Sequence, residues 1–219
     1  MDPLNLVLFG APGSGKGTQA EFISQDHGII HVATGDMLRA EAASNSELGR
    51  QARQWMDRGD LVPDQLILRL VQSRLDRDDC RPGFILDGFP RTLAQARALG
   101  GVLNQIGRDI RYVLHLNVSV AALVERLGQR RLCRECGRSY HVIGNPPVRP
   151  GVCDFDGGRL TQRSDDRPDV ARHRIEVYVD STAEVLDFYR GLGLVRDIDG
   201  SRSVDEVRVQ INQVLNAAL

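Results

Sequence analysis

The segment Gly10–Thr18, with the sequence GAPGSGKGT, combines closely spaced glycines with Lys16, the only lysine of the chain. Glycines at this spacing let successive backbone N–H groups converge on phosphate oxygens, and a helix that begins near Lys16 adds partial positive charge. A compact ammonium on a flexible stem can follow a phosphoryl group from donor to acceptor, whereas a planar guanidinium needs more room. The segment therefore predicts a phosphate-binding loop; a glycine-rich turn with a surface lysine is the alternative.

A magnesium ligand is expected away from this loop. Phosphate loops usually carry Ser or Thr directly after the lysine, but here Gly17 holds that position and Thr18 follows one residue later. Asp87 ends the apolar run FILD, where a carboxylate at the edge of a sheet could hold Mg²⁺ through its waters. A turn or helix-capping role for Asp87 before Gly88 is the other interpretation.

Two short cysteine motifs, CRECG and CDFDG, repeat one pattern: ligand, two residues, ligand, glycine. Such knuckles pair across a tetrahedral metal site, and the repeat makes an aspartate the fourth ligand. The predicted structural zinc ligands are Cys133, Cys136, Cys153 and Asp156. Asp154 and His141 compete for the fourth position without preserving the spacing, and an empty or disulfide-bonded segment is the alternative to zinc. Cys80 stands apart and is expected to be a buried thiol.

Composition places these motifs in an ordinary globular protein. The chain has 219 residues, of which 42% are hydrophobic and 26% charged, enough for one large domain with insertions. Its net charge of −1 provides no overall basic field for nucleic acid or an anionic membrane. The first residues, MDPLNLVLFG, carry an acid and an apolar run too short for a signal or membrane helix. We therefore expect a cytoplasmic protein.

Short apolar runs alternate with longer helical patterns, which indicates β-α units and a parallel sheet. The expected strands are Leu4–Phe9, Ile29–Ala33, Phe84–Leu86, Tyr112–Asn117 and Leu194–Ile198. The expected helices cover 16–26, 46–57, 64–77, 92–106, 119–131, 168–190 and 203–217.

Two segments do not fit this alternation. Residues 132–162 are rich in Gly, Pro and Cys, show no helical period and are interpreted as a small inserted domain. Residues 33–62 are longer than a single crossover needs, which favours a second, helical insertion.

Four motifs in register, GAPGSGKGTQ, TGDMLRA, LDGFPRTLAQA and TQRSDDRPD, resemble adenylate kinase in its long-lid form over essentially the whole chain. The resemblance implies an α/β fold: a P-loop NTPase-type five-stranded parallel sheet flanked by helices. It also implies a core of residues 1–32, 63–128 and 167–219, a helical AMP-binding insertion of residues 33–62, and a zinc-binding lid of residues 129–166.

The implied activity is Mg²⁺-dependent, in-line phosphoryl transfer, ATP + AMP = 2 ADP, in a monomer. The implied catalytic residues are Lys16, Arg91, Arg130, Arg163 and Arg174. The implied ATP-binding residues are Gly13, Ser14, Gly15, Lys16, Gly17, Thr18, Arg130, Ser139, Tyr140 and Arg202. The implied AMP-binding residues are Thr34, Arg39, Asp60, Leu61, Val62, Gly88, Arg91, Gln95, Arg163 and Arg174. Arginine forks fix phosphate orientation, and Gln95 can satisfy both the donor and the acceptor edge of a purine.

No general base is expected, because the attacking phosphate is already an anion near neutral pH. The histidines show no nucleophile or triad setting, and His31 and His115 fall on strands, where a structural role is favoured. A monophosphate kinase for UMP or CMP is the main alternative function. A nucleotide-regulated switch leaves the second set of arginines unexplained, and a zinc-ribbon nucleic-acid module would need a basic face with exposed aromatics.

Overall fold

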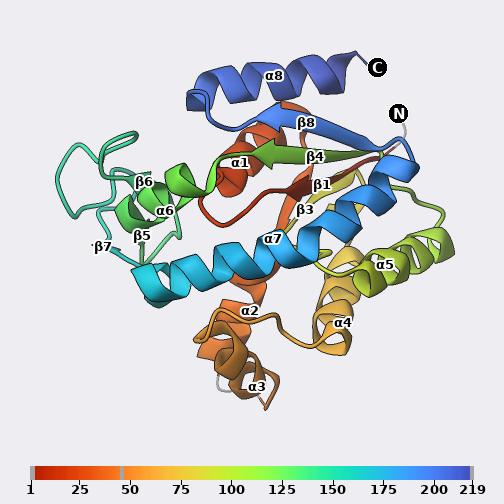
Figure 1. Ribbon diagram of the computed structural model, residues 1–219, viewed down its shortest axis with the longest axis horizontal. Helices are drawn as coiled ribbons and strands as arrows, with labels where there is room; N and C mark the ends of the chain where they lie inside the picture. The colour runs from red at the N-terminus through yellow and green to blue at the C-terminus, as the bar shows by residue number, and fades with distance from the viewer. Residues whose placement is uncertain (1–2, 45–46, 218–219) are drawn as a thin grey trace.

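A five-stranded parallel sheet forms the centre of the computed structural model, which describes residues 3–44 and 47–217 (Figure 1). The strands are β1 Leu4–Phe9, β2 Ile30–Ala33, β3 Gly83–Asp87, β4 Tyr112–Asn117 and β8 Val195–Asp199. Their order across the sheet is β2-β3-β1-β4-β8, and each neighbouring pair is parallel. Parallel strands need crossover connections, and helices provide them.

Helices cover both faces of this sheet. The helices of the described residues are α1 Lys16–His27, α2 Thr34–Ala43, α3 Glu47–Met56, α4 Asp64–Leu75, α5 Leu93–Gln105, α6 Val120–Gln129, α7 Pro168–Gly191 and α8 Val204–Asn216. Because side chains alternate along a strand, Leu6 and Leu8 of β1 pack with α1 and α8, whereas Val7 and Phe9 pack with α4, α5 and α7. Both faces of β1 are therefore buried, which explains its continuous apolar run.

Local sequence fixes several helix ends. Gly28 caps α1 with a φ of 66°, a left-handed conformation that glycine adopts without strain. Pro168 begins α7, where its missing N–H leaves no hydrogen bond unmade. Ser203 and Glu206 form a capping box at the start of α8.

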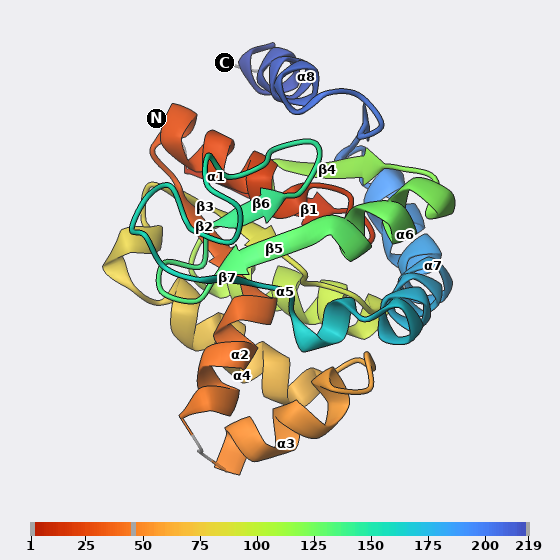
Figure 2. The same cartoon turned by 90° about the vertical axis from the view of Figure 1, so that its left-hand side faces the viewer.

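Two insertions leave the carboxyl edge of the sheet. Helices α2 and α3 form the first. The second holds a three-stranded antiparallel sheet of order β6-β5-β7, formed by β5 Arg130–Cys133, β6 Ser139–His141 and β7 Leu160–Thr161 (Figure 2). We call residues 129–166, which contain this sheet, the lid. Two 3₁₀ turns, η1 Asp78–Cys80 and η2 Ser164–Asp166, complete the elements of the described residues.

The predicted fold class and the five parallel strands are confirmed, with no strand end shifted by more than one residue. The predicted helix 119–131 is wrong at its end, because Arg130 adopts extended backbone, with a φ of −70° and a ψ of 137°, and pairs with His141. The expectation for 46–57 begins at residue 46, outside the described residues, and α2 was not separately predicted. Residues 1–2 and 218–219, the ends of the expected core, also lie outside the described residues.

Among the described residues, every helix is too short or too polar to cross a membrane.

Candidate active site

The carboxyl ends of the central strands bring the predicted phosphate-binding residues to one edge of the sheet. The glycine-rich loop follows β1, Thr34 follows β2, and Asp87 ends β3. Ligands of open α/β sheets bind at this edge, where the strand order reverses. In the order β2-β3-β1-β4-β8, the first strand, β1, lies in the middle, with β3 on one side and β4 on the other. The strand order therefore reverses at β1, and the glycine-rich loop that follows β1 lies at that point.

The glycine-rich loop has the backbone that the sequence predicts. Gly13 and Gly15 have φ values of 88° and 95°, which favour glycine. A Cβ on Gly13 would lie 3.0 Å from both the carbonyl oxygen of Leu123 and Cγ of Leu127. The loop therefore packs closely against α6 and presents the N-terminus of α1 to the edge of the sheet.

Lys16 is partly buried and folds back onto its own loop. Its Nζ donates to the carbonyl oxygens of Gly10 at 2.6 Å and Ala11 at 3.1 Å. Burial lowers the pKa of Lys16 to about 8, while Asp87 opposes this shift and the cationic groups of Arg91, Arg130 and Arg174 add to it. An anionic group placed here would be attracted by several cations at once.

Asp87 lies beside His31, which the sequence placed on a strand in a structural role. The two side chains approach to 3.4 Å, between His31 Nε2 and Asp87 Oδ2. Burial alone would raise the pKa of Asp87, but His31, Lys16 and Arg91 together lower it below the ordinary value. A carboxylate that remains ionised suits the water-mediated magnesium contact expected for this residue.

The five predicted arginines come from separate elements: Arg39 on α2, Arg91 before α5, Arg130 on β5, Arg163 before η2 and Arg174 on α7. Arg91, Arg130 and Arg174 act on Lys16, and Arg39 acts on Arg91 and Arg163. Burial of the guanidinium lowers the pKa of Arg91 to about 10, and Arg174 adds to the shift, although the residue as a whole remains exposed. Burial also lowers the pKa of Arg163 to about 10, with Arg39 and Arg130 adding to it. Burial is the largest cause of both shifts, and repulsion from neighbouring guanidinium groups adds to each.

Three acids hold these arginines, and the sequence did not predict them as site residues. Asp166 is 1% exposed and accepts from Nε of Arg130 at 2.8 Å. Asp165 lies 2.9 Å from NH1 of Arg174, and Asp36 forms ion pairs with Arg39 and, at 3.1 Å, with Arg163. The available signal is the composition of SDDRPD, which places two acids beside arginines.

A pocket beside this cluster contains all the predicted AMP residues except Arg163. Its predicted members are Thr34, Arg39, Asp60, Leu61, Val62, Gly88, Arg91, Gln95 and Arg174. The Thr34 hydroxyl donates to the carbonyl oxygen of Asp87 at 3.0 Å. Gly88 has a φ of 79°, and a Cβ there would lie 3.0 Å from Oγ1 of Thr34 and 3.1 Å from NH2 of Arg91. Leu38, Met56 and Ile67 add apolar walls that sequence reasoning missed. We call this the acceptor pocket.

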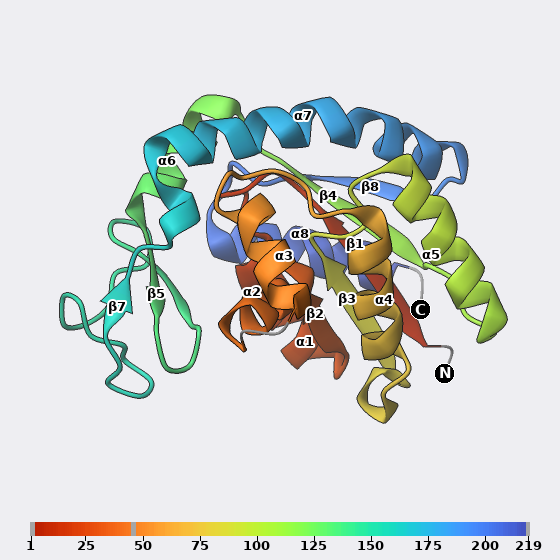
Figure 3. The same cartoon turned by 90° about the horizontal axis from the view of Figure 1, so that it is seen from below.

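The far wall of the acceptor pocket rests on α7, which runs from beside α6 to α5 (Figure 3). Gly59 has a φ of 82°, and a Cβ there would lie 2.9 Å from Cγ of Arg174. Next to it, Oδ1 of Asp60 lies 2.9 Å from Nε2 of His173. The turn that ends the first insertion is therefore held against the helix that carries Arg174.

The predicted ATP residues outside the loop occupy two separate places. Ser139 and Tyr140 lie on β6 of the lid, where Tyr140 is 5% exposed and its hydroxyl accepts from the backbone N–H of Asp154 at 2.8 Å. The Tyr140 side chain thus belongs to the interior of the lid. Arg202 lies on the exposed turn before α8, and its Nε donates to Asp199 at 3.2 Å.

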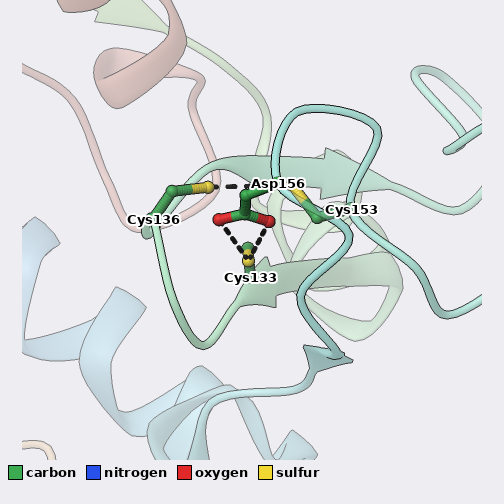
Figure 4. A group of neighbouring side chains, drawn as sticks. All are labelled: Cys133, Cys136, Cys153 and Asp156. Carbon is green, nitrogen blue, oxygen red and sulfur yellow. Dashed lines mark hydrogen bonds between the residues drawn. The ribbon is translucent and has the colours of Figure 1, made fainter.

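The four predicted metal ligands converge in the lid (Figure 4). One ligand atom from each of Cys133, Cys136, Cys153 and Asp156 lies within 4.8 Å of the others. Sγ of Cys136 and Sγ of Cys153 are 3.7 Å apart, too far for a disulfide, and the four cysteines are free. The competing ligands point elsewhere: Asp154 accepts from the backbone of Val148, and His141 accepts from that of Gly144.

The repeated motifs fold into matching knuckles. Gly137 and Gly157, at equivalent positions, have φ values of 74° and 73°. Each donates its N–H to the backbone carbonyl oxygen of the first cysteine of its own motif, Gly137 to Cys133 at 3.2 Å and Gly157 to Cys153 at 3.0 Å. The glycines are needed because the chain turns in the left-handed region directly after each second ligand.

The separations between the ligand atoms are compatible with a tetrahedral zinc site. Zinc–sulfur bonds of about 2.3 Å and zinc–oxygen bonds of about 2.1 Å separate tetrahedral ligand atoms by about 3.8 Å for S–S and about 3.6 Å for S–O. The Cys136–Cys153 separation is 3.7 Å, and the two oxygens of Asp156 lie 3.2 and 3.5 Å from Sγ of Cys133. Three thiol groups and a carboxylate are also a donor set that zinc accepts.

Comparisons with known proteins agree with this geometry. The family model described as "Adenylate kinase" matches residues 8–194. Proteins named "Adenylate kinase" from Geobacillus sp. (strain WCH70) and Bacillus subtilis (strain 168) are 49% and 46% identical over 212 residues, covering 97% of this chain and 98% of each relative. One from Brevibacillus brevis is 46% identical, covering 97% of this chain and 99% of the relative.

Proposed function

This chain belongs to the adenylate kinase family and is a phosphotransferase, and on that premise we propose how it converts ATP and AMP reversibly into two ADP. A terminal phosphate oxygen of AMP attacks the γ-phosphorus of ATP in line, and the bond from that phosphorus to the β-phosphate oxygen breaks. No proton has to be removed from the attacking phosphate near neutral pH. The chain must position two anions and neutralise the charge between them.

The acceptor pocket is the observation that carries this proposal. It gathers the predicted AMP residues beside the glycine-rich loop, and cationic side chains lie between the two. The Nε of Arg163 is buried and has no hydrogen-bond partner among the described residues, so it retains a donor for a phosphate oxygen. A bidentate ion pair with Asp166 holds the guanidinium group of Arg130 in place for both substrates. The guanidinium group of Arg174 is held through its NH1, which lies 2.9 Å from Asp165 and 3.4 Å from Asp166.

Lys16 moves with the phosphoryl group in this proposal. In the described structure its ammonium bonds to carbonyls of its own loop, from which it can swing to the transferring group. Mg²⁺ bound with ATP supplies further charge neutralisation, and Asp87 would hold it through water, since the loop has Gly17 where other phosphate loops have a hydroxyl.

The two insertions act as covers in this proposal. We assign residues 33–62 to AMP binding, residues 129–166 to the lid over ATP, and residues 1–32, 63–128 and 167–219 to the core. Excluding water matters because water would otherwise accept the phosphoryl group. Zinc in the lid would have a structural role, with all four positions filled by protein ligands.

We also propose a cytoplasmic monomer. A single chain carries the loop, the acceptor pocket and the arginines, so the proposed site needs no second copy. Free thiols at Cys80 and in the lid suit a reducing compartment.

One assay tests the proposed activity. Purified protein given only ADP and Mg²⁺ should produce ATP and AMP in equal amounts, because one ADP donates the phosphoryl group that another accepts. Failure to do so, together with transfer from ATP to UMP or CMP, would contradict the adenylate assignment.

A further inference from the structure

The side-chain amide of Gln95 is held in one orientation at the wall of the acceptor pocket. Gln95 is 3% exposed; its Nε2 donates to Oδ1 of Asp64 at 2.6 Å, and its Oε1 accepts from the backbone N–H of Arg91 at 2.7 Å. A carboxylate only accepts, and a backbone N–H only donates. A flipped amide would therefore face two wrong partners.

Asp64 is held in place at the beginnings of two helices, α4 and α5. It is the first residue of α4, and its Oδ2 accepts from the hydroxyl of Thr92 at 3.0 Å. Thr92 caps α5 by accepting from the backbone N–H of Gln95 at 3.2 Å. The carboxylate, the hydroxyl and the amide thus form a closed ring that joins α4 to α5. Within the part of the chain that the structure describes, Asp64 makes no ion pair with the arginines that surround the phosphate site.

We propose that Asp64 is a positioning residue that sets the base preference of the acceptor pocket by fixing the amide of Gln95. The inference rests on the proposed function, in which Gln95 contacts the base of AMP. A primary amide has two N–H donors and two carbonyl lone pairs, of which this network uses one each. One donor and one acceptor remain for the base. Adenine matches such a pair, because its N1 acceptor adjoins its 6-amino donor.

Reversing the polarity of the ring should reverse the preference. In Asp64→Asn combined with Gln95→Glu, the amide of the first side chain can donate to the carboxylate of the second, as the N–H of Arg91 already does. The carboxylate then has only acceptors left for the base. Guanine matches that arrangement, because its N1–H and 2-amino groups are adjacent donors.

The test compares kcat/KM for AMP and GMP, with ATP as the donor. Asp64→Ala should lower the AMP-to-GMP ratio about tenfold, mainly through the KM for AMP, because the amide loses the partner that fixes it. Asp64→Asn alone should retain most of the ratio, since its carbonyl still accepts from Nε2 and its amino group can donate to Thr92. The double variant should shift the ratio toward GMP by about a hundredfold or more.

Asp205→Ala is the matched control, since Asp205 is an exposed acid in the first turn of α8 and the change removes a similar helix-dipole interaction. It should leave the ratio unchanged. If Asp64→Ala does not fold, the double variant decides, because it keeps hydrogen-bonding groups at both positions. Folded variants with the wild-type ratio would overturn the role of Asp64 alone. A wild-type protein unable to convert ADP into ATP and AMP would instead contradict the proposed function.

Discussion

The edge of the central sheet and the lid position functional groups in different ways. The glycine-rich loop follows β1, whose residues Leu6, Val7 and Leu8 are at most 2% exposed between two helical layers. The buried cluster of the lid contains only Cys133, Tyr140, Cys153 and Leu160, and two of these are predicted metal ligands. Apolar burial orders the first region, whereas the second depends on a few polar groups meeting at one point.

The comparison teaches which changes should remain local. A large core can tolerate the loss of one charged group at its edge, because buried apolar area supplies most of the stabilisation. A segment of about 40 residues cannot bury comparable area and needs a metal or similar cross-link to hold one structure. Substitutions at the sheet edge should therefore affect chemistry without unfolding, and substitutions in the metal cluster should unfold the lid without unfolding the core.

The largest effect is expected from Lys16→Arg. The guanidinium keeps the positive charge but cannot follow the phosphoryl group in the space of a compact ammonium, so kcat should fall about 10²- to 10³-fold. The midpoint of thermal unfolding should change by less than about 3 °C, because no apolar group leaves the core. Steady-state kinetics and calorimetry measure the two effects.

The control for this swap is Arg208→Lys, which exchanges the same two side-chain types at an exposed ion pair with Asp26. It should leave kcat unchanged. Near-normal turnover in Lys16→Arg would contradict the proposed movement of the lysine.

The lid half of the comparison is tested by Cys153→Ser. Loss of one thiolate should reduce bound zinc below half an ion per chain, make residues 129–166 sensitive to protease, and lower kcat about tenfold. The unfolding transition of the core should remain. Metal analysis, limited proteolysis and calorimetry measure these effects.

Cys80→Ser provides the matched control in the core. Cys80 is fully buried, and its thiol donates to the carbonyl oxygen of Arg74 at 3.3 Å. A hydroxyl there should cost about 1–2 kcal/mol of stability while leaving the zinc content unchanged. If Cys153→Ser keeps its zinc and its protease resistance, the metal cluster does not order the lid.

The same contrast explains how much the sequence could predict. Short-range patterns predict the sheet, the loop and the cysteine knuckles, because each depends on spacing within one segment. Gly137 and Gly157, for example, make the same turn because each directly follows the second ligand of its own motif. The helix that leads into the lid extends two residues too far in the prediction, to 131 instead of Gln129, because Arg130 and Arg131 have good helix propensity and only pairing with β6 makes them extended.

Partners distant in the sequence could not be predicted. Asp36 meets Arg163 across 127 positions, and Asp60 meets His173 across 113. Nothing near Asp64 in the sequence shows that it faces Gln95, because that contact arises only when α4 and α5 pack together. Family resemblance supplied the arginines, but the acids that hold them required three-dimensional structure.

A smaller effect is expected on the pH dependence of ATP binding. It should depend on Lys16 in the core and not on the cysteines of the lid. Lys16 has a pKa of about 8 in the free protein, and a phosphate placed beside it favours the charged form. Above about pH 8, ATP binding should therefore take up a proton and weaken as pH rises. In the free protein, the lowered pKa means that this group's unfavourable contribution to stability disappears between about pH 8 and 10.5.

Calorimetry of ATP binding at pH 8.5 (about half a unit above that pKa), in two buffers of different ionisation enthalpy, measures the proton uptake. Lys16→Met should abolish it, whereas Cys153→Ser should retain it, since the lid cysteines do not appear among the groups that shift the pKa of Lys16. Equal uptake in Lys16→Met and wild type would assign the proton to another group.

The smallest effect, on the KM for AMP, is expected where the first insertion contacts α7, away from both the glycine-rich loop and the lid. His173 and Asp60 approach to 2.9 Å while their side chains remain 45% and 33% exposed, and Arg58 contacts the other oxygen of Asp60 at 3.2 Å. A half-exposed pair of this kind contributes about 1 kcal/mol or less. His173→Gln should therefore raise the KM for AMP about two- to fivefold, and leave kcat and the KM for ATP unchanged.

His27→Gln, at a histidine that lies 3.2 Å from Asn212 on α8, is the control. An equal rise in both KM values would mean that His173 stabilises the core as a whole. A selective rise would show that a single polar contact, added to the fit of Gly59 against Arg174, tunes how firmly this insertion closes the acceptor pocket.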